Sequence, residues 1–276
     1  MDLIELVVSG GLHRTVILRR YSSSGDDVGR RVARELAAMR VAAAGGVSAP
    51  ELVWVDENGI FEEEAIVISH VDGHTVTRPG GLDDWADQIA IAAAQIHSVT
   101  VDPETRRGLN DLERFVANCI AETEPPEKFM AHPFGVRLWE RRQELLGSLG
   151  RSESTFVHAD FWVGNTLWRD NRLVAVIDWE DAGFGDPLLD VADCANDMRF
   201  GGFDREADQF VSRYVQESGS DLASLPLWTI IAQTHPLPDI ARWLPSFQAM
   251  GWPDMTVDEL RERHRRMIER ALAETR

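Results

Sequence analysis

The sequence predicts an α+β protein built from two lobes, a small antiparallel-sheet lobe followed by a larger and mostly helical one. Residues 1–72 contain four short runs rich in β-branched side chains, which are typical of strands. Residues 73–276 contain most of the helix-like apolar spacing. A connector with three glycines and a proline, residues 72–81, begins the second part, so we place the boundary between the lobes near residue 73.

Two β-hairpins are expected in the first lobe, because its strand-like runs alternate with turn-forming residues. Ser9, Gly10 and Gly11 lie between the first two runs, and Asn58 and Gly59 lie between the last two. The four runs are residues 3–8, 15–21, 52–55 and 65–71.

One amphipathic helix is expected between the two hairpins. Asp26 and Asp27 can cap its first turn, and Gly45 and Gly46 can end it. Apolar side chains recur at spacings of three or four, which predicts one face packed against the sheet. These apolar positions are Val28, Val32, Leu36, Met39 and Ala43.

The second lobe should be helical except between residues 156 and 179, where two short β-like runs flank the turn-forming pair Asp170 and Asn171. Helix-like spacing or composition occurs in five segments. They are residues 83–98, about 110–121, 134–149, 204–218 and 256–274.

Composition limits the possible partners. The chain has 28 basic and 46 acidic residues, so its net charge of −18 repels nucleic acid and anionic membranes, and it either attracts a cationic ligand or serves solubility alone. Two cysteines, Cys119 and Cys194, are too few for a disulfide framework or a zinc cluster. The first residues lack the positive start of a signal peptide, and no apolar run approaches the ~20 residues that span a bilayer. We therefore expect a cytoplasmic protein with small-molecule partners.

One short region carries the residue types that phosphate transfer requires. His158, Asp160 and Asn165 follow the pattern H-x-D-x-x-x-x-N, and Asp178 ends a β-like run 13 positions after Asn165. Transfer from a nucleotide needs one carboxylate at the accepting hydroxyl and oxygen ligands that hold Mg²⁺ across the phosphates. Asp160 and Asn165 lie at the two ends of one loop and Asp178 leaves the next hairpin, so we expect them to meet at one cleft.

Residues 156–192, FVHADFWVGNTLWRDNRLVAVIDWEDAGFGDPLLDVA, resemble the signature region of the aminoglycoside phosphotransferase and choline kinase-like family, within the protein-kinase-like superfamily. The resemblance implies a two-lobed protein-kinase-like fold. It also implies that Asp160 orients or deprotonates the acceptor hydroxyl, and that Asn165 and Asp178 ligate Mg²⁺. In the same pattern Asp190 braces the catalytic loop by hydrogen bonds, and we interpret His158 as a packing residue of that loop.

The nucleotide side of the cleft is implied by the same resemblance. Arg19 occupies the strand position where many relatives have Lys, and Glu35, 16 residues later, can point across to it. Ser69 and Val71 lie in a segment similar to the hinge whose main chain reads adenine. Relative to that pattern the first lobe is truncated, without a first strand and Gly-rich lid. Either the chain starts late or the glycines at positions 10 and 11 serve a reduced version of the lid.

The predicted function is a Mg²⁺-dependent kinase that transfers the γ-phosphate of ATP or GTP to a hydroxyl of a small acceptor. Aminoglycosides, choline-like amino alcohols, sugars, amino acids and macrolides stay open as acceptors, and the net acidity favours a cationic one. The alternatives are a catalytically weak nucleotide- or ligand-binding protein on the same scaffold and, less favoured, a metal-dependent hydrolase.

Several aromatic and basic residues are expected to be structural. We interpret His97 and His235 as packing histidines, and the arginines of segment 256–274 as a solvated face. Three tryptophans near the motif are expected to pack around the loop rather than to stack on substrate. They are Trp162, Trp168 and Trp179.

Overall fold

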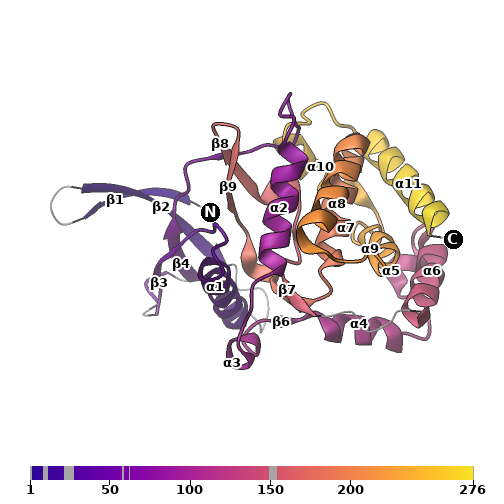
Figure 1. The fold of residues 1–276 in the computed structure, drawn as a ribbon, viewed down its shortest axis with the longest axis horizontal. Helices are drawn as coiled ribbons and strands as arrows, with labels where there is room; N and C mark the ends of the chain where they lie inside the picture. Colours follow the sequence, from indigo (N-terminus) through magenta and orange to yellow (C-terminus); the bar gives the residue numbers. More distant parts are fainter. Residues whose placement is uncertain are drawn as a thin grey trace.

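The computed structural model describes residues 2–8, 12–21, 28–57, 59–61, 63–148 and 154–275, and they form a two-lobed α+β protein with a sheet at one end and helices at the other (Figure 1). Several predicted turn and cap residues lie outside the described residues. They are Ser9, Gly10, Gly11, Asp26, Asp27 and Asn58.

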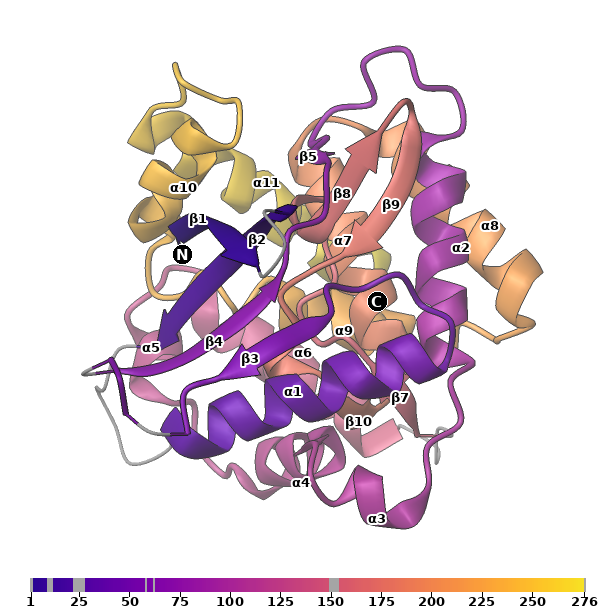
Figure 2. The ribbon, with the colours of Figure 1, turned by 90° about the vertical axis from the view of Figure 1, so that its left-hand side faces the viewer.

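The first lobe is a four-stranded antiparallel sheet with one long helix beside it (Figure 2). The strand order is β1-β2-β4-β3, and both predicted hairpins are confirmed by the pairing of β1 with β2 and of β3 with β4. The elements are β1 (Asp2–Val8), β2 (Leu12–Tyr21), α1 (Val28–Ala44), β3 (Leu52–Val55) and β4 (Glu64–Ser69).

Helix α1 buries the face that its apolar spacing predicts. Val32, Leu36 and Met39 are buried, and the helix is followed by Gly46 with a φ of 77°, a conformation that glycine adopts without strain. Ala43 is a correction, since it is exposed near the end of the helix.

The second lobe contains seven longer helices among the described residues, with α7 near its centre (Figure 1). All five predicted helical segments are confirmed, whereas α7 and α9 were not predicted. The longer helices are α2 (Trp85–His97), α4 (Leu112–Ala121), α6 (Gly135–Ser148), α7 (Leu188–Phe200), α8 (Asp204–Ser218), α9 (Leu225–Ala232) and α11 (Val257–Glu274). The short ones are α3 (Pro103–Arg106), α5 (Glu127–Met130), α10 (Leu244–Ala249), η1 (Val163–Asn165), η2 (Trp179–Asp181) and η3 (Ile240–Trp243).

Two three-stranded sheets hold the segment that carries the motif. Asp170 and Asn171 form the predicted turn, both with positive φ, which suits short polar side chains. One sheet has the order β5-β8-β9, with β5 (His74–Thr75), β8 (Thr166–Arg169) and β9 (Arg172–Val176). The other has the order β6-β10-β7, with β6 (Asn110–Asp111), β10 (Gly183–Gly185) and β7 (Thr155–Val157).

One hydrophobic cluster runs through both lobes, from Ile66 and Ile68 of β4 to Trp85 and Ile89 of α2. A shared core of this kind holds the two lobes together, because moving one lobe exposes apolar surface of the other. Both cysteines are buried free thiols. Among the helices that the structure describes, none is long and apolar enough to cross a membrane.

Candidate active site

The loop that the sequence predicts to be catalytic connects β7 to β8, and Asp160 and Asn165 contact each other across it. The Asn165 Nδ2 group donates to Asp160 Oδ2 at 2.9 Å and to the Asp160 carbonyl at 2.8 Å. Gly164 lets the loop close tightly, because a Cβ at this position would lie 2.0 Å from the Trp162 ring. The two ends of the predicted motif are therefore held together directly.

Asp190, at the start of α7, is hydrogen bonded to the beginning of this loop. Its carboxylate accepts the backbone N–H groups of His158 and Ala159, each at 2.8 Å, and contacts His97 Nε2 at 2.9 Å. Ala159 has a φ of 63°, which is unusual for a residue with a Cβ and needs such support. His97 also contacts the Tyr214 hydroxyl at 2.8 Å, so its expected role as a satisfied packing histidine is confirmed.

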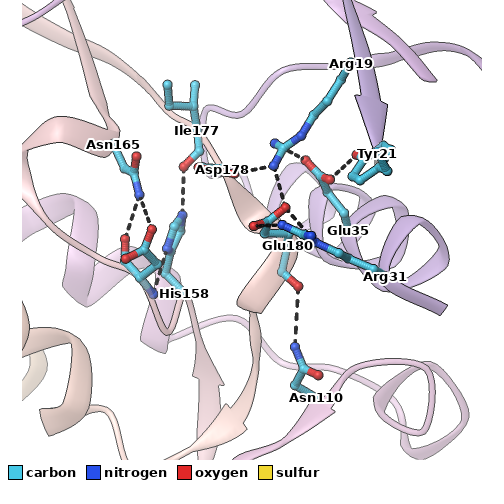
Figure 3. Close-up of polar contacts among 11 residues, drawn as sticks. Arg19, Tyr21, Arg31, Glu35, Asn110, His158, Asn165, Ile177, Asp178 and Glu180 are labelled. Atoms are coloured by element: carbon cyan, nitrogen blue, oxygen red, sulfur yellow. Dashed lines mark hydrogen bonds and ion pairs between the residues drawn. The ribbon is translucent and has the colours of Figure 1, made fainter. Parts of the chain in front are cut away.

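His158 links the catalytic loop to the segment after β9. Its Nε2 contacts the Ile177 carbonyl at 3.0 Å, and its Nδ1 accepts the Asp160 backbone N–H at 3.3 Å, an arrangement that requires the proton on Nε2 (Figure 3). Burial lowers the pKa of His158, although the nearby Asp190 carboxylate opposes this shift. A neutral imidazole at this position satisfies both contacts.

Asp178 lies beside Asn165 because their segments are joined by a backbone hydrogen bond. The Ile177 N–H donates to the Asn165 carbonyl at 2.9 Å, and Asp178 follows with a φ of 69°. This left-handed turn ends the β9 segment and directs the Asp178 side chain toward the first lobe, where Asp178 Oδ1 accepts from Arg19 Nη2 at 2.6 Å.

Arg19 of β2 is the cation that the sequence predicted at the cleft, and carboxylates from both lobes surround it (Figure 3). Its guanidinium contacts Glu35, Asp178 and Glu180, each at 2.6 Å. Glu35 is 1% exposed and accepts a further hydrogen bond from the Tyr21 hydroxyl. Burial opposes the charge of Arg19, but attraction to Glu35 and then to Asp178 raises its pKa above the ordinary value.

The donor set beside Arg19 fits Mg²⁺. Asn165 Oδ1 and Asp178 Oδ2 accept no hydrogen bond from the described residues, so each has an oxygen available for a hard cation. The part of the chain that the structure describes has no group of three or more His, Cys, Asp or Glu side chains placed to bind a metal. A site with one amide and one carboxylate therefore suits Mg²⁺ that is also held by phosphate oxygens and water.

The predicted adenine-reading segment lies at the end of β4. The Ser69 N–H donates to the Glu51 carbonyl at 2.8 Å, so this donor is already used. Among the described residues, the main chain of Val71 makes no backbone hydrogen bond. Of the two predicted contacts, Val71 keeps both of its main-chain groups available.

Asp160 has an environment suited to a base. Burial raises the pKa of its carboxyl to about 7, the hydrogen bond from Asn165 opposes the shift, and repulsion from Asp178 adds to it. A carboxylate with a pKa near neutrality can accept a proton more readily than an exposed one can.

A cavity of about 340 Å³ opens beside Asp160 in the second lobe. This volume is within the range of small-molecule sites. Its acidic wall comes from α7, where Asp193, Asn196 and Asp197 line it, and Gln233, His235, Ser246 and His264 are further polar lining residues. The apolar and aromatic lining includes Trp162, Phe200, Ile240, Trp243, Phe247 and Met250.

Several lining residues were missed or misjudged from the sequence. Trp162 packs against the core as expected and also lines the cavity half-buried, whereas Trp168 and Trp179 are fully buried. The prediction that His235 packs in the core is wrong, because it is exposed and lines the cavity. The spacing of the acidic residues at 190, 193 and 197 was a usable signal, since intervals of three and four place side chains on one face of a helix.

These features define a class of protein. A small sheet lobe with a buried Arg–Glu pair, a helical lobe with an Asp–Asn loop, and an Arg–Asp contact that joins them are the parts of a kinase-like phosphotransferase. The chain belongs to the phosphotransferase enzyme family, whose model matches residues 6–229. The resemblance found in residues 156–192 is thereby confirmed.

Individual relatives agree with this assignment. The viomycin phosphotransferase of Streptomyces vinaceus is 26% identical over 199 residues, which cover 66% of this chain and 67% of the relative. A putative aminoglycoside phosphotransferase from Ralstonia eutropha JMP134 has the same fold, with a TM-score of 0.64, 16% identity, and coverage of 99% of this chain and 92% of that one. A thermostable variant of the aminoglycoside phosphotransferase APH(4)-Ia, solved as a ternary complex with ADP and hygromycin B, has a TM-score of 0.59, 17% identity, and coverage of 97% and 93%.

The cavity wall provides a prediction about stability and pH. Burial, and then repulsion from Asp160, raises the pKa of Asp197 from 3.8 to about 7. The native state therefore binds the proton of Asp197 more tightly than the unfolded state does. The contribution of this proton to the free energy of unfolding is fully present below about pH 4 and is lost as pH rises through 7. Asp197→Asn should raise the free energy of unfolding at pH 8 by about 2 kcal/mol, an amount reduced for partial solvent contact.

Urea unfolding of wild type and Asp197→Asn between pH 4 and pH 8 measures this difference. The two stability curves should converge near pH 4. Asp254→Asn removes an exposed carboxyl far along the chain and should leave the pH profile of the wild type unchanged. A difference between Asp197→Asn and wild type that does not grow with pH would contradict the prediction.

Proposed function

We propose that this protein is a Mg²⁺-dependent small-molecule kinase that transfers the γ-phosphate of ATP or GTP to a hydroxyl of a small cationic acceptor. The observation that carries the proposal is the position of Asp160. Its carboxylate contacts Asn165, one of the two proposed metal ligands, and also lines the cavity beside α7. A hydroxyl bound in that cavity is then next to both the base and the nucleotide phosphates.

On the nucleotide side, we infer that Arg19, aligned by Glu35, contacts the phosphates and that the main chain near Ser69 and Val71 contacts the base. Asn165 and Asp178 would hold Mg²⁺, which when bound neutralises phosphate charge and orients the phosphates. The ternary complex of the APH(4)-Ia variant with ADP supports a nucleotide as the phosphate donor.

The role of Asp160 is to orient the acceptor hydroxyl and to accept its proton as the oxygen bonds to the γ-phosphorus. The bond from that phosphorus to the nucleoside diphosphate breaks, and the diphosphate leaves. Asn165 holds the carboxylate in place through its hydrogen bond to Oδ2. Asp190 and His158 support the same loop through the backbone, as the hydrogen bonds at 158, 159 and 160 indicate. Correct alignment accounts for much of the rate in phosphate transfer, so these supports matter although they do not react.

The chemistry of the cavity favours a cationic acceptor with an apolar part. Asp193 and Asp197 present carboxyl groups to it, and Trp162, Trp243 and Phe247 offer aromatic surface. Carboxylates attract ammonium groups, and aromatic faces attract cations and apolar rings. The net charge of −18 acts in the same direction at long range.

A panel of hydroxylated acceptors, assayed with ATP and GTP and with Mg²⁺ present or absent, tests the proposal. The panel pairs cationic compounds, including aminoglycosides, viomycin and choline, with neutral sugars, and ³¹P NMR identifies the product. We expect transfer to a cationic member only. Tight Mg²⁺-nucleotide binding with no transfer to any acceptor would instead favour a binding protein on this scaffold.

The acidic wall gives a sharper prediction. Burial, and then repulsion from Asp190, raises the pKa of Asp193 well above its ordinary value, and a bound ammonium group would favour its charged form. Asp193→Asn keeps the shape of the side chain but cannot form this ion pair, so the KM for a cationic acceptor should rise roughly tenfold, which corresponds to ~1.4 kcal/mol. The KM for the nucleotide should stay unchanged, because Asp193 lines the acceptor cavity. Steady-state kinetics with each substrate varied in turn measures both values. An equal rise of both KM values would argue against an acceptor role for this wall.

A further inference from the structure

Glu180 is a carboxylate that the proposed reaction does not use, yet it contacts two arginines of the other lobe (Figure 3). It lies in η2, two residues after Asp178. Its Oε2 accepts from Arg19 Nη2 at 2.6 Å and from Arg31 Nε at 3.0 Å, and its Oε1 accepts from Arg31 Nη2. One carboxylate of the second lobe is therefore shared by β2 and α1 of the first.

The contact with Arg31 is a fork, in which two nitrogens of one guanidinium meet two oxygens of one carboxylate. This geometry fixes orientation more strongly than a single contact does. Because the Arg31 side chain is 47% exposed, that of Glu180 17% and that of Arg19 10%, the fork lies at the edge of the contact between the lobes and Arg19 lies further inside.

Arg19 needs a partner that does not leave when the site is occupied. Its Nη2 group contacts both Asp178 and Glu180, and Asp178 is one of the two proposed Mg²⁺ ligands. When the Asp178 carboxylate turns toward a cation, Glu180 remains as the fixed partner of Nη2. Glu35 continues to hold the other nitrogen, Nη1, from α1.

We propose that Glu180 is a positioning residue: together with Arg31 it holds the first lobe against the second and keeps Arg19 directed at the nucleotide phosphates. This inference rests on the proposed function for its nucleotide readout. For a variant that lacks the Glu180 charge, positioning and charge alone predict opposite changes in nucleotide affinity. Removing a negative charge next to phosphates reduces repulsion and should tighten nucleotide binding, whereas losing the positioning contact should weaken it.

The main test is nucleotide affinity, measured by calorimetry with a non-hydrolysable ATP analogue, with and without Mg²⁺. Glu180→Gln should weaken binding about tenfold and leave the KM for the acceptor unchanged. Asp181→Asn is the matched control, because it removes the same charge one residue later from an exposed side chain that attracts Arg31 but accepts no hydrogen bond from the described residues. It should bind the nucleotide as wild type does or more tightly.

A second variant keeps the charge constant. Arg31→Lys retains the cation but cannot form the fork, so positioning predicts about threefold to tenfold weaker nucleotide binding, while charge alone predicts no change. The proposal would be overturned if either the Glu180→Gln or the Arg31→Lys variant bound nucleotide as tightly as the wild type does.

A measurement without nucleotide separates this proposal from the proposed function. Urea unfolding of Glu180→Gln, Arg31→Gln and the double variant forms a cycle, and we expect the double variant to lose no more than the larger single loss. Additive losses would reject the contact between the lobes. If the wild type bound no nucleotide but the cycle were non-additive, the proposed function would be rejected and the contact between the lobes would stand.

Discussion

Asp160→Asn should reduce kcat by about 10²–10⁴-fold and leave the KM for the nucleotide within about twofold, because it removes the base and keeps the shape of the loop. The asparagine can still accept the hydrogen bond that Asn165 donates to Asp160 Oδ2 in the wild type. Coupled measurement of ADP release with a saturating acceptor provides both constants. Turnover near the wild-type value would remove Asp160 from its proposed role.

The pH profile gives an internal control for this variant. Burial raises the pKa of Asp160 to about 7, so the carboxyl is protonated below that pH and cannot accept the hydroxyl proton. Wild-type kcat/KM should therefore rise with pH through about 7 and then level off. The residual activity of Asp160→Asn should lack this rise, and an unchanged rise would assign the titration to another group.

Asp190→Ala should lower the free energy of unfolding by about 3–5 kcal/mol, because two buried backbone N–H groups lose their acceptor and each costs about 1–3 kcal/mol. The acceptor bonds are those from His158 and Ala159, and His97 loses its carboxylate partner as well. The positive φ of Ala159 then has no fixed hydrogen bond to hold it, so transfer activity should fall together with stability. Urea unfolding measures the loss.

Two further variants serve as controls for Asp190→Ala. Asp190→Asn keeps one acceptor oxygen and should lose an intermediate amount. Asp208→Ala makes the same substitution in an exposed ion pair with Arg199 and should cost at most about 1 kcal/mol. If Asp190→Ala cost no more than Asp208→Ala, the backbone contacts of Asp190 would not be the support of the loop.

The elements that the sequence predicted are those with a strong local pattern. The hairpins of the first lobe carry runs of β-branched residues, and α11 carries an apolar stripe whose members Leu260, His264 and Met267 are buried. The motif at 158, 160, 165 and 178 could be found because short spacing within a loop and hairpin determines which residues meet. Arg19 and Glu35 were found through resemblance, and they are in contact.

Helix α7 was missed because it is buried around most of its circumference. Leu189, Val191, Cys194 and Met198 are all buried, so an amphipathic pattern is absent even though the segment is helical. Acidic residues fill the positions that face the cavity, and they obscure the apolar pattern further. The cavity was missed with it, because three of its polar lining residues belong to this helix.

The contact between Arg31 of the first lobe and Glu180 of the second had no local signal in the sequence. Arg31 and Glu180 are 149 residues apart in the chain, and each has the polar context of a solvated side chain. Sequence spacing indicates contacts within a helix, a loop or a hairpin, whereas this contact depends on how the two lobes pack. Only the three-dimensional arrangement identifies it.

Helix α7 carries Asp190 on its first turn and Asp193, Asn196 and Asp197 further along, so one helix bears both the residue that holds the loop at 158–160 and one wall of the cavity. A substitution that shifts the whole helix also moves Asp190, whereas residues 236–250, which line the cavity too, make no hydrogen bond to Asp190 among the described residues. Natural evolution or laboratory selection for activity on new compounds should accordingly change residues 236–250 before it changes α7.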